Sequence, residues 1–260
     1  MRVELAIIFF SEENKIFVCL GLFWFLALGA PASAGPVGEM QRIGHFMIDR
    51  TEIKVGQFRR FAEEIGFLTK AERSGGGLVY AAGWEQKVRW TWRSPYGAPS
   101  NDDEPVVHVT FDEARAYCRW AGKRLPTDAD WTEAAFTERR RSPAPPFVRA
   151  RTYQFPTGDT PKGANCLDDC GKTPALDYSA VLHRGRGRAK AGTTRAGVNG
   201  LFDMGANVWE WVDTGDGENK RTRGGSWWYG EHQMHPDHIA SMPRDMAVVY
   251  IGFRCVKDVP

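Results

Sequence analysis

A run of residues near the carboxyl end, YGEHQMHPDH from Tyr229 to His238, gathers side chains that could hold a metal. Three of the six histidines of the chain, His232, His235 and His238, recur there at intervals of three. Imidazole is the commonest metal ligand in proteins, and the thioether of Met234 suits Cu(I). The run therefore predicts a copper or iron site. The alternative is a polar pocket wall or a surface loop, since this spacing matches no recognised ligand pattern.

A second candidate is the acid Glu210, which lies between Trp209 and Trp211 in the stretch GLFDMGANVWEWVD. A carboxylate buried between two indoles must be paired, protonated or bound to a cation, because an isolated buried charge costs too much free energy. Turns that contain glycine present several carbonyl oxygens at once, and such oxygens together with a carboxylate suit Ca²⁺. Calcium at Glu210 is one prediction, and a salt bridge to an arginine such as Arg254 is the alternative.

Two oxygen-rich pairs precede this turn, Asn165 with Cys166 and Asp177 with Ser179. Carboxylate, amide and main-chain carbonyl oxygens are the ligands of hard cations. These four residues are therefore candidates for a second calcium site.

The elements that position these residues begin with a helix in the first third of the chain. Apolar residues recur at helical spacing at Val55, Phe58, Ala62 and Ile65. Thr51 and Glu52 are the start signals of this predicted helix. Residues 70–105 are rich in Gly, Pro, Ser and aromatic residues without a sustained period, so they are predicted to be ordered but irregular, held by Trp84, Trp90 and Trp92.

Two further helices follow a short strand that is predicted over residues 105–109. Thr110 and Glu113 form a capping box that opens a helix through Ala121. Thr127 is the predicted N-cap of the next helix. The acids in this second helix are assigned to capping and to a solvated face rather than to a catalytic cluster, namely Asp128, Asp130 and Glu133.

Several of these stretches together resemble one known family. The motifs, in chain order, are PVVHVTFDEARAYCRWAGKRLPTDADWTEAAF at 105–136, GLFDMGANVWEW at 200–211, RGGSW at 223–227 and GFRCV at 252–256. They are similar to the formylglycine-generating enzymes, also called sulfatase-modifying factors. The resemblance spans the chain from Ile43 to Val256 and implies a single irregular α+β domain, similar in topology to C-type lectins, with short twisted strands and two or three helices.

The resemblance also implies two structural Ca²⁺ sites. One would use main-chain oxygens of Gly205, Ala206 and Val208 with the Glu210 carboxylate. The other would use Asn165 and Cys166, with Asp177 and Ser179 at a spacing that differs from the family.

The chemistry of the family depends on two cysteines that follow the GGS strand, bind Cu(I) and use O₂ to convert a substrate cysteine to formylglycine. Aligned from Gly224, these positions fall on Tyr229 and Met234, and only Ser226 beside the oxygen site is retained. The standard reaction is therefore not expected. One hypothesis is a metal-dependent oxidoreductase whose replacement site uses Ser226, Tyr229, His232, Met234 and His235. The other is a non-catalytic module with structural calcium that binds a peptide or small-molecule partner in a groove.

Four cysteines remain beyond the amino-terminal segment: Cys118, Cys166, Cys170 and Cys255. Their even number favours disulfides, for which three connectivities are possible, over a zinc site, which would need paired CxxC spacing. The resemblance implies a bridge from Cys118 to Cys255, which leaves Cys166 with Cys170.

The amino-terminal segment, residues 1–34, is predicted to be a signal peptide. Lys15 precedes a short apolar run that ends in Pro31-Ala32-Ser33-Ala34, and the run is shorter than the roughly 20 residues of a membrane-spanning helix. The domain itself would then occupy residues 35–260. The protein is expected to be exported, periplasmic or secreted, without a stable membrane anchor after cleavage.

The charge of the chain indicates no special partner, because the formal net charge is +2. Two basic stretches, residues 139–151 and 183–190, could dock an acidic polymer or a sulfate or phosphate group, and the alternative is a solvated loop at each place. Neither stretch has interleaved aromatic residues, so nucleic acid is not an expected partner.

Overall fold

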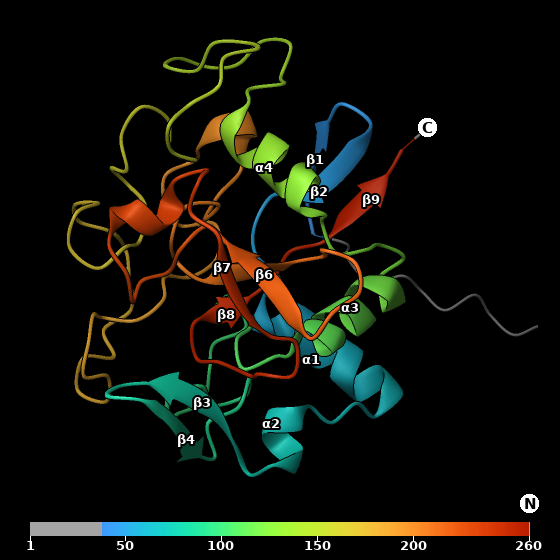
Figure 1. Ribbon diagram of the computed structural model, residues 1–260, viewed down its shortest axis with the longest axis vertical. Coiled ribbons are helices and arrows are strands. Elements are labelled where there is room, and N and C mark those ends of the chain that lie inside the picture. The colour runs from blue at the N-terminus through green and yellow to red at the C-terminus, as the bar shows by residue number, and fades with distance from the viewer. Residues whose placement is uncertain (1–37, 260) are drawn as a thin grey trace, which may run out of the picture. The chain divides into compact units, whose positions relative to one another are not determined.

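The computed structural model describes residues 38–259, so the predicted signal peptide lies outside the described residues. The described chain is an α+β fold in which short helices and small sheets are joined by long irregular segments (Figure 1). Its helices are α1 (Val55–Ile65), α2 (Lys70–Arg73), α3 (Phe111–Trp120) and α4 (Asp128–Phe136), with 3-10 turns η1 (Val198–Gly200) and η2 (Glu231–Met234). The sequence predicted two or three helices, and the short α2 is the one that was not predicted. Among the described residues no helix has the length and apolar character needed to cross a bilayer.

The strands form three separate sheets. A three-stranded antiparallel sheet contains β1 (Met40–Ile43), β2 (Phe46–Asp49) and β9 (Val256–Asp258), and a hairpin contains β3 (Gly76–Tyr80) and β4 (Trp84–Val88). The four-stranded sheet has the order β7-β6-β5-β8, with β5 (Trp209–Val212), β6 (Asn219–Arg223), β7 (Ala240–Pro243) and β8 (Ile251–Gly252). All residues of β5 are buried, so this strand holds Glu210 inside the molecule.

Helix α1 forms where the sequence predicts it, but its start differs. Val55, Phe58 and Ala62 are buried along one face of the helix, as their spacing requires. Its N-cap is Lys54, whose main-chain N–H donates to the Gln57 side chain at 2.8 Å. The prediction of Glu52 as a start signal is wrong, because its side chain is fully buried and bonds elsewhere.

Helices α3 and α4 confirm the capping predictions. The hydroxyls of Thr110 and Thr127 each accept the N–H three residues on, and the acid at that position returns the bond. Asp128 of α4 accepts from the guanidinium of Arg223 at 2.7 and 2.8 Å, across the gap to β6. Asp130 therefore caps the helix as predicted, whereas Asp128 pairs with an arginine of β6 instead of facing solvent.

The strand predicted over residues 105–109 is absent from the described structure. Pro105 makes one isolated bridge to Lys54, and Val106 donates to the carbonyl of Ile53 at 2.8 Å. His108 then takes φ of 58°, which is the left-handed region and interrupts an extended strand. The segment is a single bridge followed by a kink.

Residues 70–105 are more regular than predicted, because they contain α2 and the β3–β4 hairpin. Trp92 is fully buried and holds this region as expected, whereas Trp84 is 42% exposed on the hairpin. Gly77 is required in β3, since a Cβ there would lie 2.1 Å from the His108 ring.

His108 provides a prediction on acid stability. Burial lowers the pKa of this imidazole to about 4, although its ring nitrogens face the carbonyls of Pro95 and Ala247. When folding lowers the pKa of a base, the free energy of unfolding is highest at pH values above the unfolded-state pKa, which is 6.5 here. It falls as the pH drops towards 4, because over that interval only the unfolded state takes up the proton. We expect a loss of about 3 kcal/mol in the free energy of unfolding over that interval.

Urea unfolding of wild type and His108→Asn at several pH values measures this effect. Asparagine tolerates the left-handed backbone of this position. Glu52 and Asp203, whose pKa values are raised by burial, titrate in the opposite sense, so the quantity of interest is the difference between the two proteins. Parallel pH profiles of the two proteins would contradict the assignment to His108.

Both predicted disulfides are present. Cys118 of α3 bonds to Cys255, just before β9, and both residues are fully buried in the main core. Cys166 bonds to Cys170 within a loop. These two bridges use all four cysteines of the described residues.

Candidate functional site

The segment after β6 carries the residues that correspond to the active positions of the resembling family. Gly224 and Gly225 have φ of 95° and 80°, and a Cβ on Gly224 would lie 2.7 Å from the carbonyl oxygen of Met204. The chain therefore turns tightly here, in a way that only glycine allows. Ser226 follows and is buried, with its Oγ accepting the N–H of Trp228 at 3.3 Å.

The two positions where the family has cysteines are filled by groups that pack. Met234, on η2, is buried in a small apolar cluster with Phe155 and Ala206. Tyr229 is half-buried, and its hydroxyl lies 3.3 Å from that of Tyr250. Neither side chain offers a thiolate.

The three histidines of the predicted metal site do lie near one another. The His232 ring centroid is 5.6 Å from that of His235 and 5.6 Å from that of His238. The His235 ring, however, packs edge-on against Phe155, with centroids 4.7 Å apart. Across residues 38–259 no group of three or more His, Cys, Asp or Glu side chains is arranged to hold a metal ion. The histidine rings are therefore neighbours, but as they are placed here they do not form a ready-made copper or iron site.

His238 is half-buried. Burial lowers its pKa, and the neighbouring His232, Arg223 and His235 lower it further. His238 also lies against the Trp209 indole, with centroids 5.7 Å apart. A neutral imidazole at this place is consistent with packing.

Behind Tyr229 lies a group of buried aromatic rings, in edge-to-face and tilted contact, which the sequence analysis did not identify as a unit and which we call the aromatic stack. The Tyr229 ring centroid is 5.9 Å from that of Trp209 and 5.6 Å from that of Tyr250, and Trp228 lies 5.7 Å from Tyr250. The exposed Arg184 places its guanidinium 6.0 Å from the Tyr229 ring. We call the accessible residues Tyr229, Arg184, His232 and His238 the Tyr229 patch.

The β3–β4 hairpin adds exposed aromatic surface near this stack. Tyr80 and Trp84 are 43% and 42% exposed and contact each other edge to face at 5.2 Å. Burial raises the pKa of Tyr250, and the phenols of Tyr229 and Tyr80 raise it further, which places Tyr80 in its neighbourhood. The pKa of Glu85 on this hairpin is lowered mainly by Lys87, and the charge of His183 lowers it further, which places His183 near the hairpin.

Glu210 has the arginine partner that the sequence analysis named as the alternative to calcium. Both oxygens of its carboxylate accept from the Arg254 guanidinium, at 2.6 to 2.9 Å. Trp131 of α4 donates its indole N–H to the same carboxylate at 2.8 Å. Both charged side chains are at most 1% exposed.

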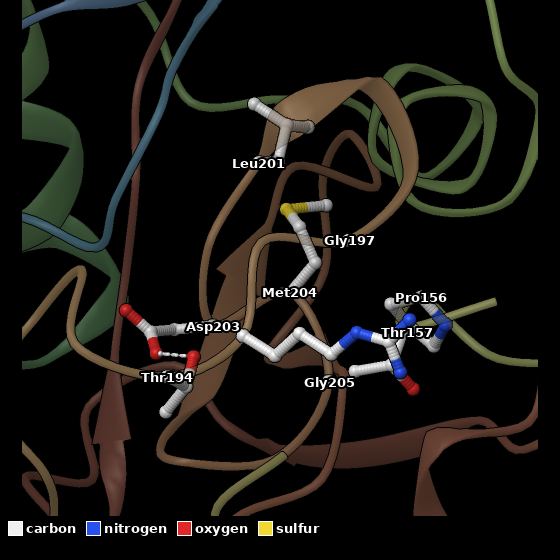
Figure 2. A pocket seen from close by; sticks show the side chains of 9 residues that line it. Pro156, Thr157, Thr194, Gly197, Leu201, Asp203, Met204 and Gly205 are labelled. Carbon is white, nitrogen blue, oxygen red and sulfur yellow. Dashed lines mark hydrogen bonds between the residues drawn. The ribbon is translucent and has the colours of Figure 1, made fainter. Parts of the chain in front are cut away.

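Two more buried carboxylates surround this pair. Glu52 accepts from the Asn207 side chain at 2.7 Å and from the N–H of Val208 at 3.1 Å. Asp203 accepts from Thr194 and borders a crevice too narrow for a water molecule (Figure 2). Burial raises the pKa of Glu52 and of Asp203, and the charge of Glu210 raises both further, whereas Arg254 lowers both. Sequence reasoning missed this cluster, since Glu52 and Asp203 lie far apart in the chain.

Asn207 connects this acidic cluster to the region of Asn165. Its amide oxygen accepts from the Asn165 side chain at 3.0 Å and from the N–H of Ala189 at 2.8 Å, while its amide nitrogen donates to Glu52. Its main-chain N–H donates to the carbonyl of Asn165 at 3.0 Å, and its carbonyl accepts from Trp227 at 2.9 Å. Asn207 itself has φ of 56°, and its bonds account for this unusual backbone.

The second set of predicted calcium ligands is placed in two different surroundings. Asn165 is buried and accepts from the Thr173 hydroxyl at 2.9 Å. Asp177, in contrast, is exposed and accepts from the N–H and hydroxyl of Ser179 at 3.0 and 2.6 Å. Asp177 and Ser179 are therefore bonded to each other in a surface turn, and among the described residues no hydrogen bond or ion pair joins them to Asn165 or Cys166.

A cavity of about 170 Å³ lies beside Asn165 and Cys166. Its remaining lining residues are Leu167, Gly171, Lys172, Thr173, Ala175, Arg186, Gly187 and Trp227. The ionisable side chains in this lining are basic.

The basic stretches are only partly solvated loops. Arg140 pairs with the buried Glu138 at 2.7 Å. Arg188 is completely buried and pairs with the buried Glu104, with its guanidinium 4.9 Å from the Tyr96 ring. Arg184 and Arg186 of the second stretch stay exposed, as do Arg141, Arg149 and Arg151 of the first.

Comparison with known proteins bears on this geometry. A family model, FGE-sulfatase, described as "Sulfatase-modifying factor enzyme 1-like domain", matches residues 11–259. The chain is 32% identical over 273 residues to the formylglycine-generating enzyme of Streptomyces coelicolor, a match that covers 88% of this chain and 83% of that protein. It is 29% identical over 254 residues to the inactive C-alpha-formylglycine-generating enzyme 2 of Bos taurus, covering 86% of this chain and 80% of that protein.

A solved structure shows the same fold. PvdO from Pseudomonas aeruginosa superposes with a TM-score of 0.55 at 19% identity, covering 82% of this chain and 80% of that one. At this identity the similarity concerns the fold alone.

Proposed function

Because the chain belongs to the sulfatase-modifying factor family, we propose that it is an exported, non-standard member that binds a peptide or a small molecule and does not generate formylglycine. The observation that carries this proposal is that the described chain has no free cysteine thiol to bind copper. All four cysteines of the described chain are in disulfides, and the two positions of the family's copper ligands hold Tyr229 and Met234. Neither a phenol nor a packed thioether replaces a pair of thiolates.

The Tyr229 patch supports binding as the remaining role. Tyr229 rests on a buried aromatic stack, which fixes its ring at low entropic cost. Arg184 supplies a positive charge over that ring, and His238 lies between His232 and Trp209, with ring centroids 5.6 and 5.7 Å away. A ligand with a flat apolar group and a carboxylate matches this arrangement of ring and cation.

The test has a chemical and a binding arm. With Cu(I), O₂ and a cysteine-containing peptide, we expect no formylglycine from wild type by mass spectrometry. The matched control is the double variant Tyr229→Cys with Met234→Cys. If this variant gains Cu(I) binding, the inactivity of the wild type is due to the residue types at these two positions. Formylglycine produced by wild type would refute the proposal.

The binding arm measures, by calorimetry, the affinity of the protein for acetylated peptides that contain one aromatic residue and one acid. Tyr229→Ala and Arg184→Gln are each expected to weaken binding about tenfold or more, because each removes one of the two recognising groups. Arg42→Gln is the matched control, since Arg42 is an exposed arginine of β1. Equal affinity of all four proteins would place the binding elsewhere.

A metal-dependent oxidoreductase is the second candidate, and the proximity of His232 to His235 and His238 favours it. The side chains would have to rearrange to bring their nitrogen atoms to one ion. Metal analysis of the purified mature protein tests this candidate. Stoichiometric copper or iron that is lost in His232→Ala with His235→Ala, and retained in the exposed-histidine control His45→Ala, would support it.

Structural calcium at the 205–210 turn belongs to the same proposal. Its support is the surplus of negative charge, because Glu52, Asp203 and Glu210 surround the single Arg254. If this surplus holds Ca²⁺, adding calcium to protein treated with EDTA should raise Tm by about 5 to 10 °C. Magnesium is the control ion, since it demands a tighter octahedral site. An unchanged Tm would mean that Arg254 and protonation balance the cluster.

Export is supported by the two disulfides, which form and persist in oxidising compartments. The predicted cleavage after Ala34 is tested by sequencing the amino terminus of the protein recovered outside the cytoplasm. An uncleaved chain that remains with the membrane would contradict it.

A further inference from the structure

The cavity beside Asn165 has the chemistry of an anion site. We propose that it binds a small oxyanion, the phosphate or sulfate group of a ligand or the free ion, with Lys172, Arg186 and the Trp227 indole as the recognising groups. This site is separate from the peptide binding proposed above, and it does not depend on that proposal.

The first argument is the charge of the lining. Lys172 and Arg186 are its ionisable members, and no carboxylate is among the residues that line it. Within the described residues Lys172 makes no ion pair, and Arg186 has only the exposed Asp177 at 3.9 Å. Asp169, on the same loop, accepts the N–H of Glu231 at 3.2 Å and is not among the lining residues. Two cations without close partners leave a positive potential in the cavity.

The second argument is an unpaired buried donor. Trp227 lines the cavity and is 1% exposed, yet its Nε1–H has no hydrogen-bond partner in the described structure. An indole N–H can only donate, and leaving it unpaired away from water costs about 1 to 3 kcal/mol. An anion accepts from such a donor, whereas a cation would be repelled by it.

The third argument is size. Since roughly 10 to 15 Å³ of such volume is enough to hold one water molecule, a cavity of about 170 Å³ has room for a tetrahedral oxyanion. Gly171 takes φ of 81° at its wall, and a Cβ built there would meet no atom within 4 Å, so this part of the wall is open. The Cys166–Cys170 disulfide fixes the loop that forms this wall.

The proposal is tested by titrating the full mature chain with inorganic phosphate and, separately, with sulfate in a calorimeter. Phosphate is expected to bind saturably at one site. Lys172→Gln and Arg186→Gln should each weaken it about tenfold, since each removes one charge-assisted bond. Trp227→Phe removes the N–H and leaves a smaller aromatic ring, and it should weaken binding by a smaller factor, about three- to tenfold. Lys162→Gln, an exposed lysine outside the lining, is the matched control and should bind as wild type does.

Circular dichroism of each variant shows that a loss of binding does not reflect unfolding. A titration with phosphoserine separates the two sources: tighter binding than free phosphate indicates an ester group on a larger ligand, and equal or weaker binding indicates the free ion. The proposal fails if phosphate and sulfate do not bind, or if they bind Lys172→Gln and Arg186→Gln as well as wild type. It also fails if Ca²⁺ binds at this cavity, with affinity lost on Asn165→Ala and raised in Lys172→Gln.

Discussion

Replacing Cys118 and Cys255 by alanine is expected to lower the free energy of unfolding by about 5 kcal/mol. This bridge joins residues that are 137 positions apart, so it removes a large part of the conformational freedom of the unfolded chain. It also lies wholly within the core, where the two sulfur atoms fill space that two alanines leave empty. Urea unfolding followed by tryptophan fluorescence measures the change.

The second disulfide is the matched control for this measurement. Cys166 and Cys170 are only 4 positions apart, and alanine at both should cost about 2 kcal/mol by the same loop-closure argument. If the short bridge costs as much as the long one, local packing rather than chain entropy would account for the stabilisation.

The second large effect concerns the buried ion pair of Arg254 and Glu210. Arg254→Met is expected to cost about 3 to 5 kcal/mol, because it leaves Glu210 buried and uncompensated beside the carboxylates of Glu52 and Asp203. The substitution also removes the donors to the carbonyls of Asp49 and Phe202. We therefore expect a markedly lower midpoint of urea unfolding at pH 7.

Two comparisons make this measurement specific. Adding Glu210→Gln to Arg254→Met should recover part of the loss, because no unpaired charge then remains at that position. Asp159→Asn removes the exposed pair of Asp159 with Arg151 and should cost no more than about 1 kcal/mol. If Arg254→Met were no more destabilising than Asp159→Asn, the cluster would have to be balanced by another cation.

The local features of this fold could be predicted from sequence because neighbouring residues determine them. Thr110 with Glu113 and Thr127 with Asp130 satisfy each other's main-chain donors, so these helix starts depend on four residues each. The family resemblance accounted for the pairing of Cys118 with Cys255, which spacing alone left open among three connectivities. The α+β fold followed from the same resemblance.

Features that depend on distant contacts could not be predicted. Glu52 has the composition of a helix start, and only the folded chain brings it to Asn207, 155 residues away. His108 similarly interrupts a segment whose apolar residues favour a strand. The contact of Glu210 with Arg254 likewise needed the folded chain, because the sequence allowed both calcium and arginine as partners.

The candidate metal run shows a different limit. Histidines three apart predict neighbouring rings, and the rings are neighbours. The direction of each ring nitrogen depends on what the ring packs against, which for His235 is Phe155 and for His238 is Trp209. Residue type and spacing therefore predicted the cluster and could not predict its coordination chemistry.

The network around Asn207 has a consequence for how the protein opens. Its amide and main chain bond to Asn165, Ala189, Glu52 and Trp227, so four separate segments share one buried residue. No one of these segments can detach without breaking bonds of the others. Their main-chain protons should therefore exchange with deuterated solvent at a common slow rate, and the surroundings of the aromatic stack and of the basic cavity should become accessible together.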